Sequence, residues 1–574
     1  MLNEPAPPTH TLATPGTTSE ARYCSAPIFL WWATLLLGLA AFWQGWYINR
    51  FGVDIESDSA VYISAGIRFA HGAGVSWPNR LGNPEPMNHF PPGWPMLIAV
   101  LEWLGLNLRL TIGTLHAAAW SLLTMWVGYS AWCVTRVRPL GLLAAGTILT
   151  CQALRGVYSY AYSDPEWYLY MMAALWCLAC WLRRPSYLWT LATAACLAAA
   201  QFTRYATLGL IVIAGLLILL RFPKTPTETK TIPWWQRGLM AGLLGLLSLG
   251  PLAAYNATHH AENDSAMGRH LVWHLIDATQ IREGVQSVAS YLVPVDLRWS
   301  YSAQAWAVVG TVAFFVGCSI WARQRIRNVT QRNLTSPPTP APLAIVLDQA
   351  ACDTPEEAVH PLARVCGWFI PIYLGILVLS MSITDPPTSL DPRILSILLP
   401  TGTIAACFLL GQAFWNRGAG QFLWRISVLG PSLLLLTLHG TYNLKHVLER
   451  TSPTTLAWWD GTASETLDAV RELAADETIY SNDPPVIFLI TRQRSEFLPD
   501  PLPSHQDDAT IAALIRARLE LMRQTLNDGG GYVVYWNQLN LADPTISLAD
   551  LKTFFPEAQV QEYSDGVVLY IKGR

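Results

Sequence analysis

The stretch GVDIESDSAVYISAG at residues 52–66 carries the residues that are most suited to chemistry. Its three carboxylates are Asp54, Glu56 and Asp58. Tyr62 follows Asp58 by four residues, or one helical turn, so the two side chains are expected on one face of a helix. A carboxylate there suits either a base that takes a proton from a hydroxyl group or a ligand of a cation. Asp54 and Glu56 are equally well explained as the solvated face of a helix.

A further acid and two arginines stand near the ends of apolar segments. Asp164 lies in SYAYSDPEW, Arg204 and Tyr205 lie in QFTRYATLG, and Arg393 lies in TDPPTSLDPRIL. Arginine binds phosphate through paired, charge-assisted hydrogen bonds, so acids and arginines in one cavity suit transfer from a phosphate-linked donor. Structural alternatives stay open: Asp164 precedes a proline and fits a helix start, and Arg204 suits a side chain that reaches the lipid headgroups. Arg393 follows a proline at an expected helix start, so it too has both a functional and a structural interpretation.

Three other candidates lie in the connections between these segments. Glu85 and His89 precede the apolar block PPGWPMLIAVLEWLG at 91–105, and Arg269 lies in the polar segment 256–302. Glu85 and His89 suit metal ligands, but without a third partner at helical spacing they fit ordinary loop residues as well. The residues therefore leave the metal unknown, with a divalent cation as the one cofactor to consider.

The composition identifies a membrane protein. Of 574 residues, 52% are hydrophobic and 13% are charged, whereas soluble domains carry about 25% charged residues. Apolar blocks long enough to cross the ~30 Å hydrocarbon core as helices recur between residues 28 and 440. We therefore expect a polytopic α-helical membrane protein of about 11–13 transmembrane helices. The eleven spans that we assign are 28–47, 112–133, 139–155, 165–182, 186–203, 205–220, 237–255, 303–321, 363–383, 393–414 and 421–440.

The positions of Lys and Arg predict the orientation of these spans. Basic residues gather in every second connection, and such connections face the cytoplasm. Eleven spans then place the N-terminus inside and the C-terminus outside, in a plasma or inner membrane. The outer loops are 48–111 and 256–302, and 322–362 is a cytoplasmic loop. Counting 91–105 as a span would reverse every later connection, so we interpret it as an interfacial or re-entrant segment.

The chain divides into three parts on composition. Residues 1–26 are polar and are expected to form a disordered cytoplasmic tail, and residues 27–440 form the transmembrane domain. Residues 441–574 carry ordinary charge and alternating stretches at 477–482, 531–536 and 566–571, with helical stretches at 461–475 and 507–526. We expect an extracytoplasmic α/β domain there, with a turn at the glycines before 531–536.

Other functions find little support in the residues. The sequence contains no glycine pattern of a nucleotide-binding fold, and neither its charge nor a basic run indicates nucleic acid. Cys177 and Cys180 have CxxC spacing, but they lie inside an expected span and suit packing better than redox or metal chemistry.

Four segments, taken in their order, resemble the GT-C superfamily of membrane glycosyltransferases. The resemblance is to the bacterial branch related to protein O-mannosyltransferases and aminoarabinose lipid A transferases, and it covers the whole chain. One departure is that Asp58 is followed by Ser59, where the relatives often have Asp-Glu. The segments are SDSAVYISAG (57–66), HFPPGWPMLIAV (89–100), YSDPEWYLYM (162–171), and the pair TRYATLGLI (203–211) and PRILSILLP (392–400).

The resemblance implies an inverting glycosyltransferase. It would move a single sugar from a polyprenyl-phosphate-linked donor to a cell-envelope acceptor, which is a glycan, a lipid or a protein, on the outer face of the membrane. Asp58 would be the base or would orient the acceptor hydroxyl, and Asp164 would support the acceptor or a cation. The residues that would contact substrate are Asp54, Glu56, Tyr62, Glu85, His89, Arg204, Tyr205, Arg269 and Arg393, of which the three arginines would bind the leaving lipid phosphate.

Three other functions remain to be distinguished. A lipid-linked oligosaccharide transferase or ligase usually has a much larger outer domain or one dominant outer loop. A transporter would place charges at mid-membrane, and a non-catalytic scaffold would tolerate the loss of Asp58.

Overall fold

The computed structural model describes residues 28–573 with interruptions. The residues outside the description are 1–27, 56, 79–83, 88–89, 221–231, 260–269, 272, 274, 293–298, 315–316, 318–319, 321–323, 325–359, 386–389, 415–420, 450–463, 474–476, 492, 494, 499–507, 537–545 and 574. The expected tail at 1–26 and almost all of the expected cytoplasmic loop 322–362 therefore fall outside the described residues.

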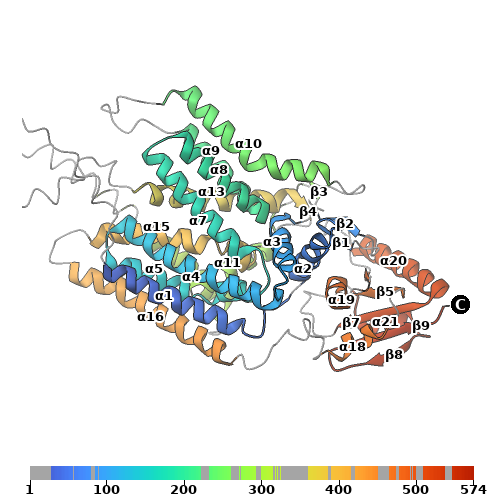
Figure 1. Cartoon of the computed structure of the whole chain (residues 1–574). Helices are drawn as coiled ribbons and strands as arrows, with labels where there is room; N and C mark the ends of the chain where they lie inside the picture. Colours follow the sequence, from blue (N-terminus) through green and yellow to red (C-terminus); the bar gives the residue numbers. More distant parts are fainter. Residues whose placement is uncertain are drawn as a thin grey trace, which may run out of the picture.

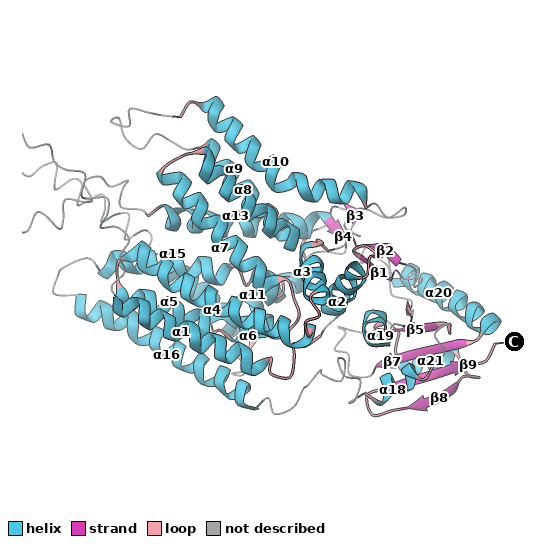
Figure 2. Cartoon of the chain, viewed as in Figure 1, coloured by secondary structure: helices cyan, strands magenta, loops and turns pink. Residues whose placement is uncertain are grey.

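A bundle of apolar helices makes up the larger part of the molecule, and a small sheet domain lies at one end of it (Figures 1 and 2). The bundle consists of α1 (Ile28–Ile48), α4 (Leu108–Thr135), α5 (Arg138–Thr150), α6 (Gln152–Ser159), α7 (Asp164–Arg183), α8 (Tyr187–Thr203), α9 (Leu208–Leu219), α10 (Trp234–Thr258), α11 (Ala278–Leu292), α13 (Pro361–Ile383), α14 (Pro392–Leu395), α15 (Leu398–Phe414) and α16 (Gln421–Glu449).

The expected polytopic helical architecture is confirmed, and each of the eleven expected spans coincides with helical residues; for 303–321 the helix covers 301–314. Within the described part of the chain, five helices are long and apolar enough to cross a membrane by length and composition. They are α1, α4, α10, α13 and the segment Pro392–Gly411.

The expected span at 139–155 is not one straight helix. Helix α5 ends at Thr150, and α6 starts at Gln152 with its axis bent by 52°. Cys151 between them has an extended backbone. Gln152 and Arg155 make the second piece polar, so burial of a straight continuation in hydrocarbon would be costly. If the pair is one broken span, it becomes a sixth candidate crossing.

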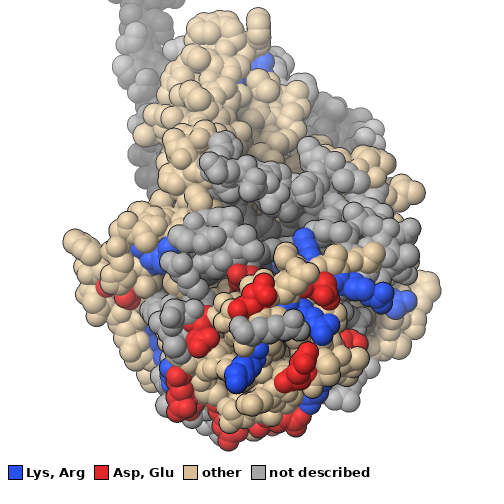
Figure 3. Space-filling view, turned by 90° about the vertical axis from the view of Figure 1, so that its right-hand side faces the viewer, with Lys and Arg blue, Asp and Glu red and all other residues tan. Residues whose placement is uncertain are grey.

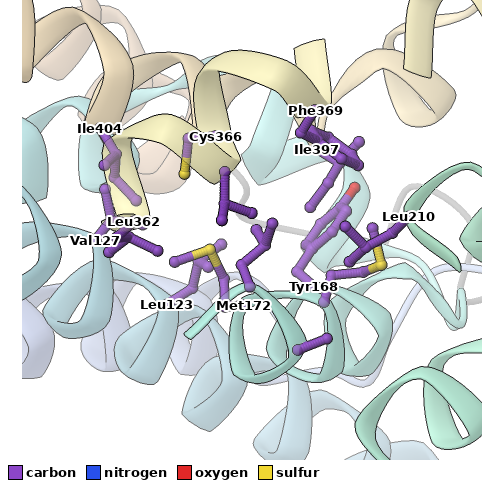
Figure 4. Packing of buried hydrophobic residues seen from close by; sticks show 14 of the residues in the cluster. Leu123, Val127, Tyr168, Met172, Leu210, Leu362, Cys366, Phe369, Ile397 and Ile404 are labelled. Atoms are coloured by element: carbon purple, nitrogen blue, oxygen red, sulfur yellow. The ribbon is translucent and has the colours of Figure 1, made fainter. Parts of the chain in front are cut away.

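The core of the bundle is formed by large apolar side chains from helices far apart in sequence. Figure 4 shows part of this cluster, with Leu123 and Val127 of α4, Met172 of α7 and Phe369 of α13 among its labelled side chains. Trp120, Trp167 and Trp181 are each fully buried in the same cluster. Close packing of this kind fixes the relative positions of the helix ends, where the ionisable residues are.

The expected outer loop 48–111 contains two short helices, α2 (Ser57–Ala70) and α3 (Gly93–Trp103), and a hairpin of β1 (Ser76–Pro78) with β2 (Pro84–Pro86). Helix α3 is the apolar block that we interpret as interfacial or re-entrant; its eleven residues rise only about 16 Å, too short to cross a bilayer. At Gly66 of α2, a Cβ atom would lie 2.7 Å from the side chain of Ile98 of α3. The absence of a side chain at Gly66 therefore allows α2 and α3 to pack closely.

The expected α/β domain is present in the C-terminal part. Its sheet has the order β6-β5-β7-β9-β8; β5 is parallel to β6 and β7, and β9 is antiparallel to β7 and β8. Gly530, before β7, has φ +74°, which explains the glycines at this turn. The elements are α18 (Glu465–Arg471), β5 (Ile479–Ser481), α19 (Pro484–Thr491), β6 (Glu496–Phe497), α20 (Asp508–Gly529), β7 (Gly531–Trp536), α21 (Leu548–Phe554), β8 (Gln559–Glu562) and β9 (Gly566–Ile571).

The C-terminal domain contacts the helical part through α19. Val486 and Leu489 of α19 are buried in one apolar cluster with Ile63 and Ile67 of α2, and the two helices lie side by side in Figure 1. In Figure 3, which looks at this end of the molecule, acidic and basic side chains are intermixed on the lower part, while the upper part is mostly uncharged. The domain therefore has a mixed-charge surface and an apolar contact with α2.

Candidate active site

Four ionisable residues from four separate segments meet in one cluster, which we call the acid–arginine cluster: Asp58, Asp164, Arg204 and Arg393. Arg204 Nη1 donates to Asp164 Oδ1, and Arg393 Nε lies 3.7 Å from Asp164 Oδ2. Arg393 Nη2 also donates to Asp58 Oδ2 over 2.7 Å. Two carboxylates and two guanidinium groups are thus neighbours although up to 335 residues separate them in sequence.

Each residue of the cluster stands at the end of a helix. Asp58 lies in the first turn of α2, and Asp164 is the first residue of α7, where the helix dipole favours a negative charge. Arg204 has an extended backbone and ends α8. Arg393 lies in the first turn of α14, which Asp391 caps by accepting a hydrogen bond from Ile394 N over 2.8 Å. The packing of these helices therefore determines the geometry of the cluster.

The two carboxylates differ in exposure. Asp164 is 1% exposed and faces both arginines, whereas the Asp58 side chain is 31% exposed. Arg204 and Arg393 are 13% and 20% exposed. An ion pair with a buried acid explains Arg204 better than contact with lipid headgroups. Asp164 is positioned to orient the arginines, and Asp58 can be reached by a substrate.

Aromatic side chains surround the cluster. The guanidinium carbon of Arg393 lies 4.3 Å from the ring centre of Tyr162, and that of Arg204 lies 5.7 Å from Trp167. Tyr62, on the same helix as Asp58, is buried beside Ser163. Burial raises the pKa of Tyr62, and the nearby Asp58 carboxylate raises it further. The Tyr62 hydroxyl therefore stays protonated and is a hydrogen-bond donor next to Asp58.

Two further candidates, Asp54 and Tyr205, lie on segments adjoining the cluster. The backbone N–H of Asp54 donates to Ser159 O over 2.7 Å, and Asp54 O accepts from Ala161 N over 3.1 Å. This bridge joins the segment before α2 to the segment before α7, so Asp54 helps to bring Asp58 and Asp164 together. Tyr205 follows Arg204 in the short helix η2 (Tyr205–Thr207) and lies beside Asn256 of α10.

Four candidates fall outside what the structure describes. Glu56, His89 and Arg269 are among the undescribed residues, and of Glu85 only the backbone in β2 is described. Their neighbours are placed: β3 (His270–Leu271), directly after Arg269, pairs with β4 (Thr384–Asp385), shortly before Arg393. Among the described residues, no group of three or more His, Cys, Asp or Glu forms a metal site.

The structure adds residues that the sequence patterns did not single out as site candidates. His116 of α4, which is fully buried, lies 3.7 Å from Glu166 of α7. The Glu166 side chain is 12% exposed and follows Asp164 by two residues along the helix. Trp167 Nε1 donates to Thr207 Oγ1 over 2.7 Å, and the Tyr168 hydroxyl is hydrogen bonded to Ser396. A histidine inside a span is itself a signal of function, whereas the pairings of Trp167 and Tyr168 leave no local pattern.

Comparisons with known proteins support the fold. No protein-family model matches the sequence, and no curated protein matches it. Among solved structures, ArnT from Cupriavidus metallidurans bound to undecaprenyl phosphate is 14% identical with a TM-score of 0.50, over 94% of this chain and 98% of ArnT. The apo form of ArnT is 13% identical with a TM-score of 0.51, over 94% and 97% of the two chains.

A third similar structure is the oligosaccharyltransferase of Archaeoglobus fulgidus in complex with Zn and sulfate. It is 10% identical with a TM-score of 0.45, over 94% of this chain and 73% of the other. The likeness to ArnT shows that this chain shares the ArnT fold over nearly the whole length of both chains.

Proposed function

We propose that this protein is an inverting glycosyltransferase of the GT-C type. It moves a single sugar from a polyprenyl-phosphate-linked donor to a hydroxyl group of a cell-envelope acceptor, on the outer face of the membrane. The observation that carries the proposal is the acid–arginine cluster, in which two arginines and one reachable carboxylate meet at the ends of α2, α7, α8 and α14. The GT-C fold shared with ArnT, whose structure contains undecaprenyl phosphate, supports it.

In this reaction the carboxylate of Asp58 acts on the acceptor, and the two arginines act on the donor phosphate. Asp58 takes the proton of the acceptor hydroxyl while the acceptor oxygen bonds to the anomeric carbon of the sugar. The bond between that carbon and the phosphate oxygen breaks, and polyprenyl phosphate leaves with the electron pair. Arg204 and Arg393 stabilise the negative charge that develops on the phosphate. One displacement from the opposite face inverts the anomeric configuration.

Arg393 links the phosphate side of the cluster to the acceptor side, because its guanidinium group also contacts Asp58. A phosphate that binds Arg393 competes with the Asp58 carboxylate for the same guanidinium group. Donor binding therefore releases Asp58 to contact the acceptor. The protonated Tyr62 hydroxyl lies close by and is available to orient either the carboxylate or the sugar. Glu56, Glu85, His89 and Arg269 remain proposed substrate contacts.

The direct test is donor consumption by purified protein in lipid nanodiscs. The assay uses a panel of polyprenyl phosphate-sugars, lipid-linked oligosaccharides, and glycan, lipid and protein acceptors. We expect consumption of a single-sugar donor and release of polyprenyl phosphate, with at least a 100-fold loss in Asp58→Asn. If the protein consumes only lipid-linked oligosaccharides, it is instead an oligosaccharide transferase. Unchanged turnover in Asp58→Asn would exclude the mechanism in which Asp58 is the base. A parallel arm with EDTA, then added Mg²⁺ or Mn²⁺, shows whether a divalent cation takes part.

A further inference from the structure

Both arginines of the acid–arginine cluster begin a turn that a buried hydroxyl residue closes three positions later. Thr207 follows Arg204, and its Oγ1 donates to the Arg204 carbonyl oxygen over 2.9 Å. Ser396 follows Arg393 in the same way, and its Oγ donates to the Arg393 carbonyl oxygen. Thr207 and Ser396 are 0% exposed. Two unrelated segments therefore have the same local arrangement, arginine followed by a hydroxyl residue at the third position.

Each hydroxyl group accepts a second hydrogen bond from an aromatic side chain of α7. Trp167 Nε1 donates to Thr207 Oγ1 over 2.7 Å. The Tyr168 hydroxyl bonds to Ser396 Oγ, and because Ser396 has one proton, which goes to the Arg393 carbonyl, Tyr168 is the donor. Both aromatic residues are fully buried. The backbone of each arginine is thus connected to α7 through two consecutive hydrogen bonds.

The connections start on the face of α7 that carries Asp164. Trp167 and Tyr168 follow Asp164 by three and four residues, so the three side chains lie one turn apart on one face. The first turn of α7 therefore pairs with the two guanidinium groups, while the second turn bonds to the turns that carry them. This arrangement fixes the position of both the backbone and the guanidinium group of each arginine.

We propose that Trp167 with Thr207 and Tyr168 with Ser396 are two tethers that position Arg204 and Arg393 for a phosphate group. All four are positioning residues. That the phosphate belongs to a polyprenyl phosphate rests on the proposed function; the tethering of the arginines does not. A guanidinium group that is already ordered loses less side-chain entropy when it binds a phosphate. Removal of a tether should therefore weaken phosphate binding by the arginine that the tether holds.

The first test measures each arginine directly and needs no substrate. Phenylglyoxal modifies accessible guanidinium groups, and peptide mass spectrometry gives the rate at each residue. We expect Thr207→Val to accelerate modification of Arg204 severalfold and leave Arg393 unchanged, and Ser396→Ala to do the reverse. Trp167→Phe and Tyr168→Phe should reproduce the effect of their partners, and each double variant should add little to its single variants. Equal rates in the wild type and all four single variants would overturn the proposal.

Matched controls separate tethering from the general loss of a buried hydrogen bond. Thr401→Val removes a buried hydroxyl that donates to the Ile397 carbonyl oxygen, and Trp120→Phe removes a buried indole bond to Ile148. Both should lower the thermal midpoint without changing modification of Arg204 or Arg393. If these controls accelerate modification as much as the tether variants do, the effect is general destabilisation and the proposal is wrong.

The second test asks what the positioned arginines bind. Thermal stabilisation by undecaprenyl phosphate gives its apparent affinity, which we expect to fall about fivefold in Thr207→Val and in Ser396→Ala, the effect of one hydrogen bond. Affinity unchanged in both variants while the arginines become accessible would reject the phosphate-positioning role. A wild-type protein that neither binds this lipid nor consumes any donor, but shows the selective modification, would instead reject the proposed function and retain the tethers.

Discussion

At the scale of single residues, the two carboxylates of the cluster are chemically alike but differ in surroundings. Asp164 is buried against two guanidinium groups, whereas Asp58 is partly exposed and pairs with Arg393. Removal of one charge from a buried pair leaves the other unpaired and costs about 3–5 kcal/mol. A partly exposed pair is worth much less because water screens it.

This contrast predicts different outcomes for two isosteric substitutions. Asp164→Asn should lower the thermal midpoint strongly and abolish donor consumption, because Arg204 and Arg393 lose their shared partner. Asp58→Asn should abolish donor consumption with a midpoint close to that of the wild type. The measurement is tryptophan fluorescence during heating, on protein purified in the same detergent. A larger loss of stability in Asp58→Asn than in Asp164→Asn would contradict the assigned positions.

The arginines of the cluster give a second prediction at this scale. Arg393 donates from Nη2 to Asp58 while its Nε faces Asp164, and lysine has one charged atom that cannot reach both acids in this way. Arg393→Lys should therefore lower kcat/KM for the donor by at least tenfold. Arg109→Lys is the matched control, since Arg109 bonds to a backbone carbonyl oxygen outside the cluster. Wild-type kinetics in Arg393→Lys would show that the double contact is not needed.

At the scale of elements, the sequence predicts the helices better than their junctions. Apolar length places nearly every helix of the bundle, and the proline after Asp164 and before Arg393 marks two helix starts correctly. The break at Cys151 escapes the hydropathy pattern because Gln152 and Arg155 are too few to interrupt an apolar average. The pairings of Trp167 and Tyr168 escape it too, since they depend on how η2 and the end of α14 pack against α7.

The contact between α19 and α2 predicts that the C-terminal domain supports the cluster. Leu489 is 6% exposed and packs with residues of α2, the helix of Asp58, while Leu519 is 8% exposed inside the C-terminal domain itself. Leu489→Ala and Leu519→Ala remove similar buried surface, so both should destabilise the domain by about 2–5 kcal/mol. Hydrogen exchange in α2 should increase only in Leu489→Ala, and its kcat should fall. Equal exchange in α2 for both variants would mean that α19 does not support that helix.

At the scale of the whole molecule, the four residues of the cluster come from segments that the distribution of Lys and Arg assigns to one side of the membrane. Their proximity agrees with that assignment, because residues at opposite membrane faces would be separated by about 30 Å. The positive-inside rule predicts the outer side, since a basic connection such as the one at Arg183 and Arg184 lies at the other end of α7 from Asp164.

Labelling from outside the cell tests this direction. In a variant without native cysteines, Val560→Cys places a thiol on the exposed strand β8, and Tyr187→Cys places one beside the basic connection before α8. Both positions are more than 40% exposed, at 42% and 44%, so accessibility does not distinguish them. A membrane-impermeant maleimide should label Val560→Cys in intact cells and Tyr187→Cys only after permeabilisation. The reverse result would place the cluster and the C-terminal domain in the cytoplasm. The donor would then have to be used on the face where cytoplasmic nucleotide sugars are available, and a lipid-linked carrier would give the reaction no advantage.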